Sequence, residues 1–327
     1  MKAIALLHSS RAKSAYFNDY IAVSKAELSW VLSSCGLVST DFTHVKIGEM
    51  DFFHLDLAAD QEATVMPKLV RLSFVAGIFE RKDNSLLPLD LNPNFALHED
   101  FIYGAKFKGK TNETLTQLLV NIGLAAIDYN KINEVKLLDP MCGRGTTMLW
   151  ALNYGCQAKG IEQEETVLND VRQMIKKWTK IHRQKHHLHE GSIGAKIGKK
   201  GNEKFIDLTV NGCTMRVING DSTQANRLLK NEKFHMLVTD LPYGVQHFTT
   251  AKTRNPTEVL KACASDWCNS LKPGGVMVMS FNNYIPKREE LIEVFSEQPL
   301  EVLDFTAPHR MSESIVRDIL VLKKSSI

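Results

Sequence analysis

The chain lacks several features that would assign it to a well-known class. Its six cysteines form no Cys-x-x-Cys pair, which argues against a disulfide framework or a zinc site and fits free thiols in a reducing compartment. No apolar stretch is long enough to span a bilayer. The first residues, Met1–Leu7, have no long apolar core or cleavage site of a signal peptide. We therefore expect a cytoplasmic protein with no metal and no membrane contact.

Charge and composition are equally unremarkable in bulk. The formal net charge is only +3, so it does not predict nucleic-acid binding, and any basic surface must be local. The 327 residues, 44% of them hydrophobic, are enough for a substantial core and favour two domains. No internal repeat or low-complexity segment is present.

A change in composition and in the pattern of expected strands and helices indicates where the two domains meet. Residues 81–99 are rich in Asp, Asn, Pro and Leu, and Pro88 and Pro93 interrupt any regular element there. We read this stretch as a linker, with a packed loop as the alternative. The prediction is an N-terminal domain with its linker at residues 1–100 and a second domain at residues 101–327.

The first domain is expected to be a small ferredoxin-like α+β domain. Its elements follow the order β-α-β-β-α-β, and Ser24 and Glu27 stand at the spacing of a helix capping box. The expected strands are Lys2–Leu7, His44–Ile47, Phe52–Leu57 and Phe74–Glu80, and the expected helices are Ser24–Cys35 and Glu62–Leu72.

The second domain alternates strands and helices, which predicts an α/β fold with a parallel sheet covered on both faces. Asn211-Gly212 is a strong hairpin signal, and the closing pair of strands predicts an antiparallel edge. The expected strands are Val135–Asp139, Gln157–Glu162, Phe205–Val210, Thr214–Asn219, Phe234–Thr239, Val276–Phe281, Leu300–Phe305 and Ile315–Leu322.

A glycine-rich turn follows the first of these strands, with the sequence Asp-Pro-Met-Cys-Gly-Arg-Gly-Thr at residues 139–146. Gly143 and Gly145 permit positive φ and a close approach of the backbone to a ligand. Acidic residues end successive strands at Asp139, Glu162 and Asp221. The second follows the first by 162 − 139 = 23 residues, near the roughly 20-residue spacing at which an acid binds ribose hydroxyls. This pattern, without G-x-G-x-x-G, favours a nucleoside cofactor over a dinucleotide phosphate site.

A second motif, Asp-Leu-Pro-Tyr-Gly at residues 240–244, ends another apolar strand. An exocyclic amine on a nucleobase is a poor nucleophile because its lone pair is delocalised into the ring. Asp240 and the carbonyl of Leu241 or Pro242 can accept the two amine hydrogens, and Asp240 can then take the proton. Pro242 stiffens the loop, and Tyr243 offers a face on which an extruded base can stack. Together the two motifs predict an S-adenosylmethionine-dependent methyltransferase, against the alternative of an ordinary turn at a strand end.

These motifs resemble the RNA methylase family that contains the THUMP-associated tRNA guanine-N2 methyltransferases, over roughly residues 106–322. The resemblance implies a Rossmann-like, seven-stranded methyltransferase domain with an antiparallel edge strand. It implies transfer of a methyl group from S-adenosylmethionine to the exocyclic N2 amine of a guanosine, with tRNA as the expected RNA. The family pattern is Asp-Pro-Pro-Tyr, and here Leu241 replaces the first Pro. About one hundred N-terminal residues cannot hold both a ferredoxin-like and a THUMP domain, so we expect THUMP to be missing or severely reduced.

The resemblance also implies a set of site residues. Glu162 would hold the ribose and Asp221 the adenine, while the role of Arg144 stays open. The candidate cofactor site is Asp139, Pro140, Cys142, Gly143, Gly145, Thr146, Glu162, Gln163, Asp221 and Ser222, with Pro140, Cys142, Gly143, Gly145 and Thr146 at the methionine end. The candidate catalytic residues are Asp240, Pro242 and Tyr243, and candidate substrate contacts beside them are Leu241, Gly244, His247 and Phe248.

Residues 176–204 form a basic, histidine-rich insertion between the second and third strands. It holds nine Lys or Arg against two acids, together with four histidines. One interpretation is a flexible arm that contacts phosphates, in which Lys196, Lys199 and Lys200 would bind RNA. The other is a solvated helix end with a loop. The histidines have no companion carboxylate or Cys cluster in sequence, so we expect no metal there.

Two rival functions remain open from the sequence. A DNA adenine-N6 or cytosine-N4 methyltransferase uses the same amine-binding logic, but no target-recognition domain is evident. A catalytically silent RNA-binding scaffold would not need the intact acids Asp139, Glu162, Asp221 and Asp240. The RNA species, the nucleotide methylated, mono- against dimethylation, the oligomeric state and the need for a small activator subunit are left open.

Overall fold

The computed structural model describes residues 1–38, 41–107, 110–127, 132–193, 203–242, 256–312 and 315–326. The chain forms two compact units, one of Met1–Asn94 with Phe305–Arg317 and one of Phe95–Asp304 with Asp318–Ile327. The predicted boundary at residues 100 and 101 differs from this division, which falls between Asn94 and Phe95 and also assigns Phe305–Arg317 to the first unit. The reason is packing: the Phe305 and His309 rings lie 5.2 and 5.0 Å from the rings of Trp30 and Tyr16.

The first unit has the predicted ferredoxin-like topology. Its sheet has the order β2-β3-β1-β4-β5, and every neighbouring pair is antiparallel. Buried phenylalanines, including Phe52, Phe53 and Phe74, fill its core. The strands are β1 (Lys2–His8), β2 (Phe42–Ile47), β3 (Met50–Leu57), β4 (Val75–Lys82) and β5 (Ser85–Pro88), and the helices are α1 (Ser10–Tyr16), α2 (Tyr20–Ser33) and α3 (Ala59–Leu69).

The predicted capping box of α2 is wrong. The helix begins at Tyr20, so Ser24 and Glu27 lie inside it and are fully buried. The Glu27 carboxylate instead accepts hydrogen bonds from the backbone N–H and the hydroxyl of Ser73, at 3.0 and 2.6 Å. A buried carboxylate needs such donors, so Glu27 ties α2 to the turn before β4.

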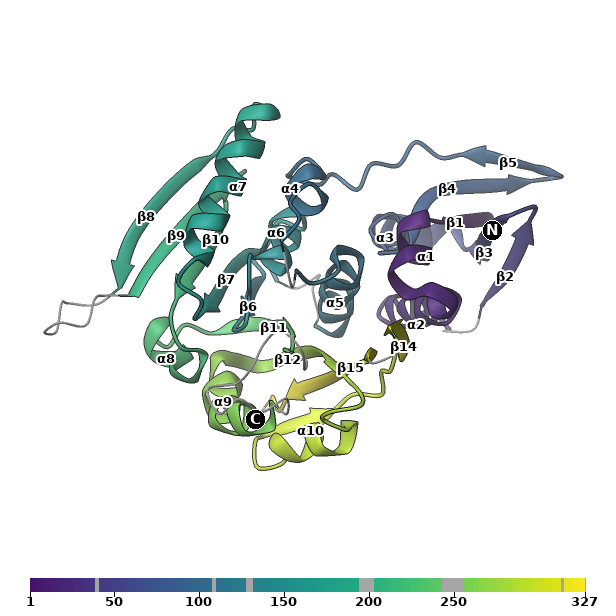
Figure 1. Ribbon diagram of the computed structural model, residues 1–327. Coiled ribbons are helices and arrows are strands. Elements are labelled where there is room, and N and C mark those ends of the chain that lie inside the picture. The colour runs from purple at the N-terminus through teal and green to yellow at the C-terminus, as the bar shows by residue number, and fades with distance from the viewer. Residues whose placement is uncertain are drawn as a thin grey trace, which may run out of the picture. The chain divides into compact units, whose positions relative to one another are not determined.

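The second unit contains the large α/β sheet expected for a methyltransferase (Figure 1). Seven strands follow the order β13-β15-β12-β11-β6-β7-β10, and β9 and β8 extend the β10 edge. The pairs among β12, β11, β6, β7 and β10 are parallel, whereas β13 pairs antiparallel with β15. The strands are β6 (Lys136–Asp139), β7 (Gln157–Glu162), β8 (His187–Ile193), β9 (Glu203–Val210), β10 (Cys213–Asn219), β11 (Phe234–Asp240), β12 (Leu271–Asn282), β13 (Leu300–Val302) and β15 (Ile315–Lys324). β14 (His309–Ser312), which pairs with the start of β15, lies in the Phe305–Arg317 segment of the first unit.

Helices cover both faces of this sheet, with α5, α6 and α7 on one side and α8, α9 and α10 on the other (Figure 1). This confirms the predicted fold class. Within the described residues, no helix combines the length and apolar character needed to cross a membrane. The helices of this unit are α4 (Asp100–Tyr103), α5 (Glu113–Ala126), α6 (Thr146–Asn153), α7 (Val167–Ile181), α8 (Ala225–Leu228), α9 (Thr257–Ser270) and α10 (Arg288–Val294).

The sheet is wider than the expected seven-stranded domain because two strands extend its β10 edge: β9, predicted as Phe205–Val210, and β8, which lies in the insertion after α7. β8 pairs antiparallel with β9 from His187↔Thr209 to Ile193↔Glu203. The predicted Asn211-Gly212 hairpin joins β9 to β10, and both turn residues have positive φ, 50° and 81°. Part of the expected flexible arm is therefore regular sheet, while Lys196, Lys199 and Lys200 lie outside the described residues.

The order of the parallel strands places the functional residues. In an open α/β sheet, ligands bind outside the carboxyl ends of the strands, where the strand order reverses. Here β6 lies between β7 and β11. The strands that follow β6 in the chain are added first on its β7 side and later on its β11 side, so the strand order reverses at β6. The turns after β6, β7, β10, β11 and β12 consequently share one edge.

Candidate functional site

The turn after β6 is built as the glycines predict. Gly143 and Gly145 have φ values of 50° and 83°, a region that other residues adopt only with strain. A side chain added at Gly143 would meet no heavy atom within 4 Å, so this face of the turn is open to a ligand. The Gly145 N–H donates to the carbonyl of Cys142 at 2.8 Å, and the Cys142 N–H donates to the carbonyl of Ile161 at 3.1 Å. The turn is thereby held against β7.

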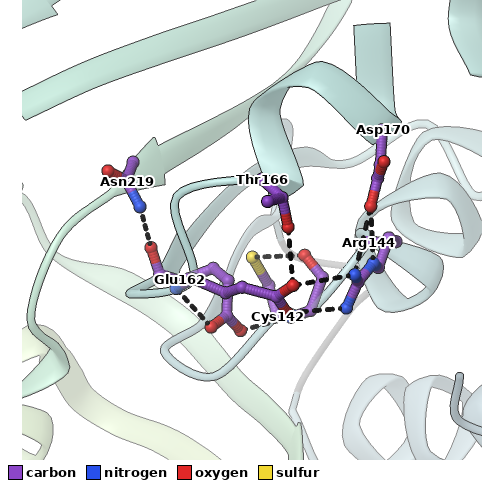
Figure 2. Close-up of polar contacts among 8 residues, drawn as sticks. Cys142, Arg144, Glu162, Thr166, Asp170 and Asn219 are labelled. Atoms are coloured by element: carbon purple, nitrogen blue, oxygen red, sulfur yellow. Dashed lines mark hydrogen bonds and ion pairs between the residues drawn. The ribbon is translucent and has the colours of Figure 1, made fainter. Parts of the chain in front are cut away.

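Glu162, at the end of β7, is joined directly to this turn. Its carboxylate accepts hydrogen bonds from the backbone N–H of Gly143 and of Glu164, both at 3.0 Å. Its carbonyl accepts from the Asn219 side chain at 3.0 Å (Figure 2) and from the Gly220 N–H at 2.9 Å. Asp139, Glu162 and Asp221 were predicted to end β6, β7 and β10. These three strand ends therefore meet around Glu162.

Arg144, whose role the sequence left open, fastens the same turn to α7. Its guanidinium forms ion pairs with Glu164 at 2.9 Å and with Asp170 at 3.1 Å (Figure 2). The Thr166 hydroxyl donates to the same Glu164 carboxylate at 2.6 Å. Because a guanidinium presents several donors in a fixed plane, one side chain can hold both acids. Arg144 is thus a structural residue of the turn.

Asp139 and Cys142 lie behind the turn and face the interior. The Asp139 side chain accepts a hydrogen bond from the Met141 N–H at 3.1 Å and is only 2% exposed. Burial raises the pKa of Asp139 to about 7, against the opposing effects of Thr147 and the Met141 N–H. Burial also raises the pKa of the Cys142 thiol. These residues anchor the turn from the inside.

Gln163, Asp221 and Ser222 lie on the accessible side of the strand ends. Gln163 and Asp221 are exposed, and Ser222 is half-buried. The Asp221 carboxylate accepts from the N–H and the hydroxyl of Thr223, at 2.9 and 2.8 Å. Its position is therefore fixed at the surface of the site, where a carboxylate can meet a polar ligand.

Asp240 ends β11, the neighbour of β6. The register Leu237↔Leu138 places the two strand ends side by side, and adjacent strands are about 4.8 Å apart. One Asp240 oxygen accepts a hydrogen bond from the Thr111 hydroxyl at 3.0 Å. The following Leu241 is buried, and its N–H donates to the Ser280 carbonyl of β12 at 2.8 Å. Asp240 and the glycine turn therefore lie on neighbouring strand tips, as predicted.

The sequence interpretation missed Thr111 itself. Lys110 is nearly buried, and its ammonium donates to the carbonyls of Ile102 and Ala105 and to Glu113. The Asn112 side chain caps α5 by accepting from the N–H groups of Thr114 and Leu115. The Asn cap was readable from sequence, but the contact of Thr111 with Asp240 spans 129 residues and leaves no local signal.

Of the remaining candidate residues after Asp240, the structure describes Pro242, which is half-buried at the end of the described segment. Tyr243, Gly244, His247 and Phe248 lie outside the described residues. Their roles stay predictions.

One histidine of the insertion does have a carboxylate partner, contrary to the sequence interpretation. His182 lies 2.8 Å from Asp100, and His98 lies 3.5 Å from the same carboxylate. The two imidazole rings stack at 3.6 Å with an interplanar angle of 14°. The ligand atoms of His98, Asp100 and His182 all lie within 4.8 Å of one another, a spacing at which these three side chains could hold a metal ion.

The fold defines a class: a Rossmann-like methyltransferase domain with a glycine-rich turn after β6 and Asp240 at the end of β11. Residues 107–303, well over half of the chain, match the family model described as the RMKL-like methyltransferase domain. The chain belongs to this family of the RNA-methylase kind, and its cofactor is S-adenosylmethionine.

The chain is similar at low identity to several solved structures. TrmN from Thermus thermophilus has a TM-score of 0.45 and 14% identity, over 85% of this chain and 57% of that chain. Magnesium protoporphyrin IX methyltransferase (ChlM) from Synechocystis PCC 6803, crystallised with bound SAM, has a TM-score of 0.43 and 14% identity, over 69% and 89%. An rRNA methylase from Streptococcus thermophilus has a TM-score of 0.36 and 10% identity, over 59% and 88%. The chain thus spans little more than half the length of TrmN, and no curated protein matches it.

Proposed function

We propose that this protein methylates the exocyclic N2 amine of a guanosine in RNA, with tRNA as the substrate. The observation that carries this proposal is the placement of Asp240 beside the glycine turn, with one carboxylate oxygen fixed by Thr111. An aromatic amine needs an acceptor for its hydrogens and a methyl donor on the opposite side. The neighbouring tips of β6 and β11 supply positions for both.

The cofactor, when bound, supplies an electrophilic methyl group. Pro140, Cys142, Gly143, Gly145 and Thr146 are proposed to line its methionine end, because they form the turn with the open glycine face. Glu162 is proposed to bind the ribose hydroxyls, with Gln163 beside it, and Asp221 and Ser222 to bind the adenine. The supporting observation is that Glu162 and Asp221 retain accessible carboxylates at adjoining strand ends. Asp139 completes the site by anchoring the turn.

Asp240 is proposed to hold the guanine amine and to receive its proton. The carbonyl of Leu241 or Pro242 is proposed as the second acceptor, since the hydrogen bond from the Leu241 N–H to the Ser280 carbonyl holds the chain against β12 directly before these carbonyls. Tyr243 is proposed to stack on the extruded base, with Gly244, His247 and Phe248 as further contacts. Lys196, Lys199 and Lys200 are proposed to contact RNA phosphates.

The proposed organisation is a ferredoxin-like domain at residues 1–100, followed by the catalytic domain at residues 101–327. The first unit consists of one five-stranded antiparallel sheet with its helices. We propose that it assists RNA capture in the absence of a full THUMP domain. A cytoplasmic location is part of the same proposal.

The decisive experiment is transfer of a labelled methyl group to unmodified tRNA, to ribosomal RNA fragments and to duplex DNA. The expected product, identified by nucleoside mass spectrometry, is N2-methylguanosine in tRNA. Asp240→Ala is expected to abolish transfer while calorimetry still detects S-adenosylmethionine binding, and Glu297→Gln, an exposed acid on the surface, serves as the control. Methylated adenine or cytosine in DNA, or full turnover by Asp240→Ala, would contradict the proposal.

A further inference from the structure

The loop after β12 lies next to Asp240 at the end of β11. β11 and β12 run parallel with Asp240 opposite Ser280, so Asn282, the last residue of β12, lies two residues further toward the same edge. Ligands of such sheets bind outside these carboxyl ends. Residues 282–287 therefore border the site where the methyl acceptor is expected.

This loop exposes two large hydrophobic side chains. Tyr284 is 43% exposed and Ile285 is 48% exposed, whereas Pro286 between them and α10 is buried. In the described part of the second unit, Tyr284 is the only aromatic residue among the exposed large hydrophobic side chains. Single exposed apolar residues are ordinary on a surface, but an aromatic ring beside the proposed acceptor site calls for a functional explanation.

The backbone of the loop is fixed, so the ring is presented at a low entropic cost. The Ile285 N–H donates to the Asn282 carbonyl at 3.1 Å, and the Tyr284 N–H donates to the Asn282 side chain at 3.4 Å. The Lys287 N–H donates to the Glu290 carboxylate at 2.9 Å. A ring on a preorganised loop loses little freedom when it stacks on a ligand.

A cation accompanies the ring. The Lys287 ammonium lies 5.9 Å from the centroid of the Tyr284 ring, and the Lys287 side chain is exposed. An aromatic face beside a flexible cation is the combination with which proteins bind single-stranded nucleic acid, because bases stack on the ring and the cation meets the backbone phosphate.

We propose that Tyr284 is a stacking platform for a nucleobase adjacent to the methylated guanosine, and that Lys287 contacts the phosphate between them. The ligand is thus an unpaired stretch of RNA. This inference rests on the proposed RNA methyltransferase function and adds a substrate contact to it. Extruding the target base leaves its neighbours without a stacking partner, and the exposed ring supplies one.

The test is steady-state methylation of an RNA that the wild-type protein methylates, with RNA concentration varied at saturating S-adenosylmethionine. Tyr284→Ala is expected to raise KM for RNA by roughly 5- to 150-fold, the range for loss of one base–aromatic stack, while kcat and cofactor affinity stay within about twofold. Tyr284→Phe keeps the ring and is expected to behave like the wild type. Val302→Ala, which shortens another exposed apolar side chain, is the control for a general surface effect.

Lys287→Ala gives an independent readout. Removing one phosphate contact to a single strand is expected to reduce the slope of log affinity against log salt by about 0.7, measured by fluorescence anisotropy with the same RNA. An unchanged KM in Tyr284→Ala, or an equal increase in Tyr284→Phe or Val302→Ala, would overturn the inference. If the wild-type protein methylates no RNA at all, the proposed function fails instead, so the two failures are distinguishable.

Discussion

Replacing Thr111 with valine is the sharpest test of how Asp240 is held. Valine keeps the β-branched shape of threonine and removes only the hydroxyl. In the structure this hydroxyl donates a 3.0 Å hydrogen bond to one carboxylate oxygen of Asp240. The neighbouring Lys110 and Asn112 fix the segment by their own hydrogen bonds, so the backbone is expected to stay in place.

The size of the effect follows from the kind of bond removed. A hydrogen bond to a charged group contributes about 1.5–3 kcal/mol, which corresponds to a loss of roughly 10- to 150-fold if the bond orients Asp240 for the reaction. We therefore expect kcat to fall within this range. Affinity for S-adenosylmethionine should be preserved, because Thr111 contacts the acceptor side of the site and makes no described contact with the glycine turn.

The assay is single-turnover methyl transfer at saturating cofactor, with calorimetry of cofactor binding in parallel. Thr111→Ser restores the donor and is expected to recover most of the rate. Thr209→Val, which removes a 2.8 Å hydroxyl contact with Thr214 between β9 and β10, is the matched control and should leave kcat unchanged. A full rate in Thr111→Val, or cofactor binding weakened as much as kcat, would refute the positioning role.

Three further predictions concern the cofactor turn. Glu162→Gln places an amide where the carboxylate accepts two N–H groups and should weaken S-adenosylmethionine binding by about tenfold or more in calorimetry; equal affinity to the Glu165→Gln control would contradict this. Arg144→Lys cannot hold Glu164 and Asp170 together and should cost about 1–2 kcal/mol of unfolding free energy in urea, more than Arg172→Lys at the more exposed pair with Glu190. Burial raises the pKa of Asp139 from its ordinary 3.8 to about 7. Between these two pH values the folded state keeps a proton that the unfolded state releases. The contribution of Asp139 to the free energy of unfolding therefore falls from about pH 4 to pH 7 and then levels off. The free energy of unfolding of Asp139→Asn, relative to that of the wild type, should therefore be about 2–3 kcal/mol higher at pH 8 than at pH 5. A difference that does not change with pH would show that the carboxyl group titrates normally.

The parts of the fold that could be predicted are those that depend on the types of neighbouring residues in the sequence. The positive φ of Gly143 and Gly145 follows from residue type at a sharp strand-to-helix turn, and both angles are as expected. The Asn211-Gly212 hairpin is a second local signal that the structure confirms. The carboxyl ends of β6, β7 and β10 lie at the predicted residues because an acid or a glycine breaks the apolar run there, whereas β13 ends at Val302 and not at the predicted Phe305.

The parts that were missed depend on contacts between distant residues. Ser24 and Glu27 have capping-box spacing, yet the buried partner of Glu27 is Ser73, 46 residues away. β8 is polar and rich in histidine, and it forms a strand because the neighbouring β9 offers a free edge for pairing. The contact of Thr111 with Asp240 joins residues 129 positions apart in the chain, so no local pattern indicates it.

The assignment of Phe305–Arg317 to the first compact unit has a consequence for biogenesis. The N-terminal ninety-four residues leave the ribosome long before the segment that supplies His309 and Arg310, whose partners are Tyr16 and Asp19. This module therefore remains incomplete until residues 305–317 have been translated. A nascent chain stalled before residue 305 would carry a partly formed module, and a chaperone that shields it would find its site near α1.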